Sequence, residues 1–142
     1  MHPEIEYALV EAGNDNYIMA KTLVEKSMEK FGVGDYKIAK TFKGKDIAGL
    51  EARHPFIDRN SRVVLAEYVS MEDGTGCVHT APGHGQDDYF TGKRYGLPVI
   101  MPVDPKGRFD KTAGDLAGIK IYDANKLILE TLKLHEHLHV TY

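Results

Sequence analysis

A chain of 142 residues with 42% apolar and 27% charged residues has the size and composition of one soluble globular domain. Its longest apolar runs, such as residues 63–66, are too short to span a membrane, and residues 1–4 lack the basic and apolar parts of a signal peptide. The net charge of -3 argues against strong stand-alone binding to nucleic acid, and the single cysteine, Cys77, excludes an internal disulfide and favours the reducing cytoplasm.

Strand patterns recur along the whole chain. From the N-terminus, alternating or β-branched stretches predict strands at residues 5–10, 17–20, 36–42, 62–68, 77–80 and 135–142. Two further strands are expected on either side of the turn at residues 104–107, and residues 13–16 favour a turn between the first two strands. The one basic cluster indicates a solvated strand edge, where lysines discourage unwanted pairing: Lys37, Lys40, Lys43 and Lys45.

The first helix is predicted over residues 22–31. Thr22 and Glu25 resemble a capping box, and Gly32 can close the C-terminus. The apolar face that the spacing predicts consists of Leu23, Val24, Ser27, Met28 and Phe31.

Two more helices are predicted further along. One begins near Gln86, and the last runs from Asp123, an expected N-cap, to Lys133. The ends of the former carry residues that suit the helix macrodipole and a C-cap: Asp87, Asp88, Lys93, Arg94 and Gly96. Many short strands with a few helices indicate an α+β fold, a curled mixed sheet or partly closed β-barrel with flanking helices, formed by residues 1–142 as one domain.

The residues that could carry chemistry gather at one strand–loop–helix junction. His79, His84, Asp87 and Asp88 lie within ten residues of one another, around a glycine-rich loop that allows close approach of a ligand. Asp87 can cap the helix, and Asp88 can hold a cationic amine. The same four side chains suit zinc or manganese, although the two histidines lack the spacing of a helical zinc motif. Cys77, just before the loop, is expected to be a small core residue rather than a nucleophile.

A second histidine group occupies the predicted last strand. His135, His137 and His139 alternate, so they share one face of that strand. The expected meaning is a polar, solvent-facing side, with a metal site as the alternative.

Several blocks of sequence together resemble a known family. They occur in the family's order and span most of the chain from about residue 2 to residue 133: residues 54–65, 74–89, 92–99 and 102–109. They resemble the editing insertion of isoleucyl-tRNA synthetases, which are class I aminoacyl-tRNA synthetases. Related valyl and leucyl enzymes share the opening Gly-Thr-Gly at residues 74–76 and the later acidic position. The combination of residues 79–85 with Asp87, Asp88 and Tyr89 resembles the isoleucyl type specifically.

The resemblance implies post-transfer proofreading, the hydrolysis of valine wrongly esterified to the isoleucine tRNA. One missing methylene changes binding by only ~1–3 kcal/mol, and isoleucine against valine is the standard instance of this problem. A second, smaller pocket that admits valine and excludes isoleucine solves it. The implied partners are the 3′ end of tRNA(Ile) carrying valine and the rest of the synthetase chain, in the cytoplasm.

The resemblance also implies roles for individual residues. Asp88 matches the acid that grips the α-ammonium group of the substrate, and His79 matches the pocket histidine that helps exclude the larger side chain. The wall around the substrate is expected to comprise Thr80, Ala81, Gly83 and His84. The implied nucleophile is a water positioned by backbone, hydroxyl groups and the terminal ribose, with no metal and no cofactor.

Two departures from the family bear on activity. The family's site also uses a threonine-rich strand before the region that matches residues 2–4, and the chain stops in a strand-like stretch. We therefore expect a piece of a longer protein, without the synthetic domain, that folds and edits poorly or not at all. The alternatives are a module that binds a tRNA end or an amino acid without hydrolysis, and a metal-dependent hydrolase.

Overall fold

A computed structural model describes residues 1–134 of the chain. They form two compact units: unit 1 comprises Met1–Ala52 and Asn60–His79, and unit 2 comprises Arg53–Arg59 and the chain from Thr80 onward. None of the helices in residues 1–134 has the length and apolar character that crossing a bilayer requires. The strand expected at residues 135–142, with its three histidines, lies outside the described residues.

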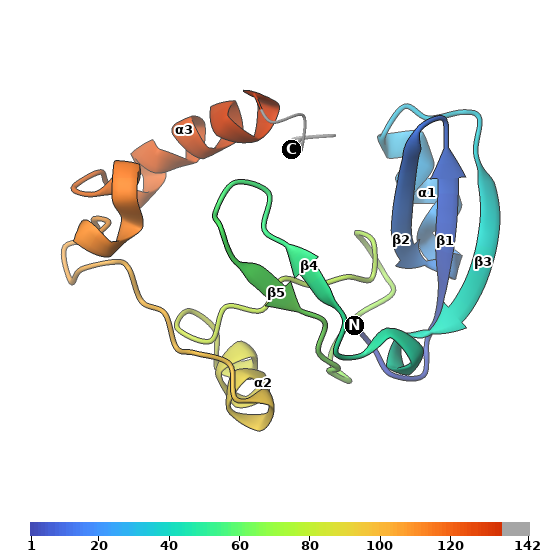
Figure 1. The fold of residues 1–142 in the computed structure, drawn as a ribbon, viewed down its shortest axis with the longest axis horizontal. Coiled ribbons are helices and arrows are strands. Elements are labelled where there is room, and N and C mark those ends of the chain that lie inside the picture. Colours follow the sequence, from blue (N-terminus) through green and yellow to red (C-terminus); the bar gives the residue numbers. More distant parts are fainter. Residues whose placement is uncertain (135–142) are drawn as a thin grey trace. The chain divides into compact units, whose positions relative to one another are not determined.

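Unit 1 is built on a three-stranded antiparallel sheet with the order β2–β1–β3 (Figure 1). The strands are β1 (Glu6–Ala12), β2 (Asp15–Ala20) and β3 (Lys37–Lys43). β1 and β2 form a hairpin in which Ala12 faces Asp15, so the turn is two residues long. The three strands predicted from alternation are confirmed, with ends that differ by one or two residues.

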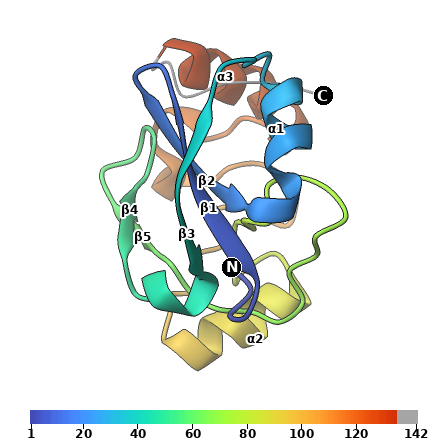
Figure 2. The same cartoon turned by 90° about the vertical axis from the view of Figure 1, so that its right-hand side faces the viewer.

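A helix covers one face of this sheet, as Figure 2 shows. After the short 3-10 helix η1 (Lys21–Leu23), α1 (Val24–Lys30) buries Val24 and Met28 against the sheet. The sheet residues of this core are Ala8, Val10, Ala12 and Met19. The predicted apolar face is confirmed. The capping box is wrong, because neither η1 nor α1 has a side-chain cap hydrogen bond and Thr22 lies inside η1.

The lysine-rich strand β3 is an edge strand, as predicted from the lysines. Lys37 pairs with Glu11 across the sheet, while Lys43 and Lys45 both contact Glu4 at 2.9 Å. Hydrogen bonds from Lys43 and then Lys45 lower the pKa of Glu4 to about 2. The 3-10 helix η2 (Gly44–Ile47) follows β3 directly.

The next part of the chain forms a short hairpin of β4 (Glu51–Arg53) and β5 (Asn60–Arg62). The strand predicted at residues 62–68 is wrong beyond Arg62. Val64, Ala66 and Val69 are still buried. The β-branched and apolar residues of this stretch therefore pack into the interior and do not belong to a β-sheet.

Unit 2 is mainly helical and irregular within the described residues. It contains α2 (Gln86–Tyr95), the 3-10 helix η3 (Lys111–Leu116) and α3 (Ile121–Leu134). The strands expected around residues 104–107 are reduced to single bridges, Val103 with Phe109 and Arg108 with Lys120. α3 begins two residues before Asp123, which stands in its first turn rather than at the N-cap.

The α+β class is confirmed, since small antiparallel sheets combine with a few helices. The ladders found within residues 1–134 form one three-stranded and one two-stranded sheet, and they do not close into a barrel. The single domain expected over residues 1–142 stays a prediction.

Candidate functional site

The candidate segment comprises residues 74–89, and its first half, residues 74–79, belongs to unit 1 and is held there through backbone groups. Three consecutive carbonyl groups, those of Gly74, Thr75 and Gly76, each accept a hydrogen bond from a different element. The donors are the Ser27 hydroxyl of α1 at 3.1 Å, the Ala20 backbone N–H of β2 at 2.8 Å, and the Tyr7 hydroxyl of β1 at 2.8 Å. These three carbonyls are therefore satisfied although the stretch is not a strand.

Gly76 lies in a position that only glycine fits. Its φ is 71°, in the left-handed region, and an added Cβ would stand 2.6 Å from the Cβ of Ala20 and 3.0 Å from Met71. The strand predicted at residues 77–80 is wrong, because this stretch has no ladder. Cys77 is exposed rather than a core residue, and its thiol lies 3.6 Å from the carbonyl oxygen of Ile18.

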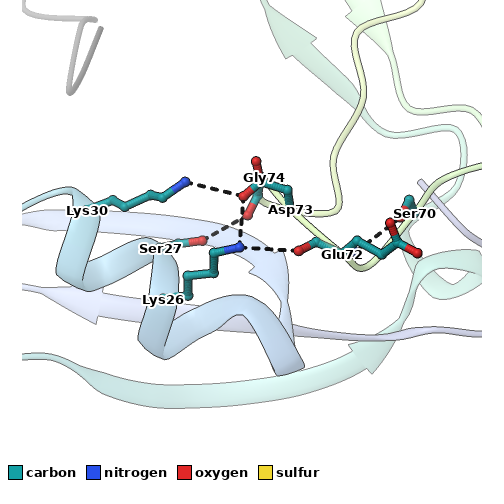
Figure 3. A network of polar contacts seen from close by, with 7 residues as sticks. All are labelled: Lys26, Ser27, Lys30, Ser70, Glu72, Asp73 and Gly74. Carbon is teal, nitrogen blue, oxygen red and sulfur yellow. Dashed lines mark hydrogen bonds and ion pairs between the residues drawn. The ribbon is translucent and has the colours of Figure 1, made fainter. Parts of the chain in front are cut away.

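An ionic contact secures the start of this half, as Figure 3 shows. The Asp73 carboxylate pairs with Lys26 at 3.0 Å and with Lys30 at 3.3 Å, both on α1. Lys26 also donates to the Glu72 carbonyl oxygen at 3.3 Å. The hydrogen bond from the Gly74 backbone N–H, followed by those from the two lysines, holds the pKa of Asp73 well below its usual range.

The second half of the segment is organised around Asp88 in unit 2. The Ala81 N–H donates to Asp88 Oδ2 at 3.1 Å, and the His84 N–H donates to the Ala81 carbonyl at 2.9 Å, which closes a turn. Asp88 is the third residue of α2, and Gly85, the N-cap residue, has no side chain to cap the helix. The carboxylate therefore stands at the positive end of the helix and holds the preceding loop to it.

Two glycines let this loop pack closely. Gly92 on α2 is buried, and a Cβ there would stand 2.6 Å from Cγ of Pro82. A Cβ on Gly83 would run into the carbonyl oxygen of Ile100 and stand 2.6 Å from Met101. The predicted limits of α2 are confirmed, with acids in its first turn, Lys93 and Arg94 in its last, and Gly96 at its C-cap.

The sequence-predicted site residues fall in both units. His79 is exposed and is the last residue of unit 1, whereas the other candidates belong to unit 2. The structure brings Ala81, His84 and Asp88 together by hydrogen bonds, with Gly83 inside the same turn. Thr80, Ala81, Gly83 and Asp88 are half-buried, and His84 is exposed.

Sequence reasoning missed the residues that hold residues 74–76 in place. Tyr7 and Ser27 lie 69 and 47 positions before their partners, and each resembles an ordinary core or helix residue in its local pattern. As for metals, residues 1–134 contain no group of three or more histidine, cysteine or acidic side chains that could hold an ion.

Comparison with known proteins identifies the class. The family model described as "Leucyl-tRNA synthetase, editing domain" matches residues 6–129. A solved structure described as "The crystal structure of GlLeuRS-CP1" shares the fold, with a TM-score of 0.73 over 100% of this chain and 77% of that chain, at 15% identity. The chain belongs to this family of aminoacyl-tRNA synthetase editing domains.

Sequence relatives narrow the type. The isoleucine–tRNA ligase of Petrotoga mobilis is 56% identical over 94% of this chain and 14% of its own length. That of Fervidobacterium nodosum is 48% identical over the same shares, and that of Kosmotoga olearia is 46% identical over 97% of this chain and 15% of its own length. The resemblance to the isoleucyl type is confirmed, and the chain spans about one seventh of the length of these curated relatives.

Proposed function

We propose that this domain hydrolyses the ester of valine misattached to tRNA(Ile), as the editing domain of an isoleucyl-tRNA synthetase. The observation that carries the proposal is the Asp88 carboxylate, fixed by the Ala81 N–H at the start of α2 and next to the glycine-rich loop. A carboxylate already oriented by the backbone loses little freedom when it binds an ammonium group. Its charge gives that contact the strength of a charge-assisted hydrogen bond.

The other candidate residues complete the proposal. His79 limits the size of the side chain that is admitted, and Thr80, Ala81, Gly83 and His84 contribute to the wall around the substrate. Water is the nucleophile, so no covalent enzyme intermediate forms. The rate acceleration comes from orientation of the ester and from charges placed where the transition state develops them.

The proposed partners follow from the relatives. The substrate is the 3′ end of tRNA(Ile) carrying valine, and the remainder of the synthetase chain delivers it, because a net charge of -3 disfavours strong stand-alone binding to RNA. The reaction takes place in the cytoplasm and uses no cofactor.

Hydrolysis of Val-tRNA(Ile) and Ile-tRNA(Ile), measured with protein in excess over tRNA, tests this proposal. The wild-type chain should release valine slowly, and still faster than isoleucine. Asp88→Asn keeps an oxygen for the Ala81 N–H and removes the charge, so a role in ammonium binding predicts a loss of about 10- to 100-fold, from the ~1.5–3 kcal/mol of a charged hydrogen bond. Asp87→Asn, in the same turn of α2, is the matched control and should keep the rate.

The outcomes separate the alternatives. An Asp88→Asn chain as fast as wild type would show that Asp88 only holds the loop. Binding of Val-tRNA(Ile) without release of valine would favour the binding module. We also predict that a longer form, with the family's threonine-rich strand placed before residue 2, hydrolyses faster than the 142-residue chain; equal rates would contradict this.

A further inference from the structure

The stretch that leads to His79 is oriented by groups from the sheet and helix of unit 1. Three consecutive carbonyls accept hydrogen bonds from these elements. The Tyr7 hydroxyl donates to Gly76, the Ala20 N–H to Thr75, and the Ser27 hydroxyl to Gly74. A carbonyl hydrogen bond fixes the plane of its peptide, and three in succession fix the direction in which the chain continues. His79 follows only three residues after the last of them.

Tyr7 holds the end of this stretch nearest to His79, at Gly76. Its side chain is fully buried, its hydroxyl donates to the Gly76 carbonyl at 2.8 Å, and the same oxygen accepts the His2 N–H at 2.8 Å. Both its donor and acceptor capacities are thus used, which holds the hydroxyl in one orientation. Ser27 is also buried, and its carbonyl partner is next to Asp73, which Lys26 and Lys30 hold from the same helix (Figure 3).

We propose that Tyr7 and Ser27 are positioning residues of the editing site, which set the path of residues 74–76 and thereby place His79. This inference rests on the proposed function. Neither hydroxyl is expected to touch the substrate, because both are buried and donate to backbone carbonyls inside unit 1. Their effect on hydrolysis is indirect and falls on the maximal rate rather than on substrate binding, since a misplaced group near the reacting ester slows the reaction in the bound state.

The test combines hydrolysis of Val-tRNA(Ile) with nuclear magnetic resonance of the 142-residue chain. Tyr7→Phe removes one oxygen and keeps the ring. We expect the maximal single-turnover rate to fall about 3- to 30-fold at an unchanged half-saturating protein concentration. The backbone amide signals of Cys77, Val78 and His79 should shift at the same time. Ser27→Ala should act in the same direction and less strongly, because Gly74 is two residues further from His79.

Tyr17→Phe is the matched control. It removes a tyrosine hydroxyl from the same sheet, and that hydroxyl donates to Asp15 Oδ2 at 3.4 Å. The control should keep both the maximal rate and the three amide signals. Measurements are made at a temperature at which circular dichroism shows each variant fully folded, so a loss of rate cannot come from unfolding.

Each result decides the question. Wild-type hydrolysis with an unchanged maximal rate in both Tyr7→Phe and Ser27→Ala overturns the positioning role and leaves the proposed function intact. If the wild-type chain releases no amino acid, the proposed function fails for this chain, and the amide signals decide alone. Shifts at residues 77–79 in Tyr7→Phe and not in Tyr17→Phe then support the positioning role, and unchanged signals overturn it.

Discussion

The two halves of the candidate segment are held by different kinds of contact. Residues 74–76 depend on donors from β1, β2 and α1, all far away in the sequence. Residues 81–88 depend on each other, through the turn closed by His84 and through the bond from Ala81 to Asp88. In the first half, residues 74–76 attach the chain to unit 1, whereas His79 carries the proposed chemistry. In the second, Asp88 serves both, so Asp88→Ala removes the loop contact and the charge together, whereas Asp88→Asn removes the charge and keeps an acceptor for the Ala81 N–H.

The largest loss of stability is expected at Gly76, which lies close to residues far away in the sequence. Gly76→Ala adds a methyl 2.6 Å from the Cβ of Ala20 at a φ of 71°. Backbone strain and overpacking should together lower the free energy of unfolding by about 2–4 kcal/mol in a urea titration. Gly74→Ala is the control, because its φ of 73° is similar but nothing lies within 4 Å of the added methyl. It should cost only about 1 kcal/mol, and equal losses would contradict the close contact.

A smaller loss of stability is expected at Gly92, where a substitution tests the packing of residues 81–88 on α2. Alanine normally stabilises a helix by about 1 kcal/mol relative to glycine. Here its methyl would stand 2.6 Å from Pro82, so Gly92→Ala should destabilise by about 1–3 kcal/mol. Introduced into Pro82→Gly, the same substitution should lose most of this cost. A cost that persists there would show that the contact with Pro82 is not its cause.

Removal of the Asp88 side chain should loosen residues 81–88 and leave the attachment of residues 74–76 in place. Asp88→Ala loses a charged hydrogen bond and a favourable charge at the start of α2, at a cost of about 1–2 kcal/mol. Amide hydrogen exchange should speed up at Ala81 and His84 and stay unchanged at Ala20, which donates to Thr75. Faster exchange at Ala20 as well would mean that the two halves are coupled.

The smallest effect concerns the exposed ion pairs of Asp73. Because the folded pKa is depressed, the carboxylate contributes stability above its ordinary pKa of about 3.9, and this contribution is lost as the pH falls toward the folded value. Between about pH 5 and about pH 2, the melting temperature of Asp73→Asn should therefore fall less steeply than that of wild type. Glu72→Gln leaves the carbonyl that Lys26 contacts and should follow wild type.

Local patterns predicted those elements that depend on local interactions. Alternation and the turn expected at residues 13–16 predicted the β1–β2 hairpin, although the turn itself is only residues 13 and 14. Charges with a C-terminal glycine specify α2. The strand predicted at residues 62–68 was wrong, because apolar β-branched residues also suit an irregular buried stretch such as the one that buries Val64. The acid at residue 88 could be singled out as a candidate because it exceeds what capping requires.

The attachment of residues 74–76 could not be predicted from their own sequence. Glycines indicate a turn or a close approach and do not say what is approached. The partners, Tyr7 and Ser27, sit in a strand and a helix in which any buried residue would satisfy the pattern. Only the tertiary structure shows that their hydroxyls point at glycine carbonyls.

The long separation between Tyr7 and Gly76 also has a consequence for the order of folding. The β1–β2 hairpin and α1 form contacts over short stretches of chain, whereas the Tyr7–Gly76 bond spans 69 positions. Contacts of high sequence separation carry a larger loop-closure entropy and are generally made after local ones. As the chain leaves the ribosome, the strands of the sheet and α1, which end at Lys43, emerge before residue 76 does. We therefore expect residues 74–76, and with them the stretch that carries His79, to attach after the β1–β2 hairpin and α1 have formed.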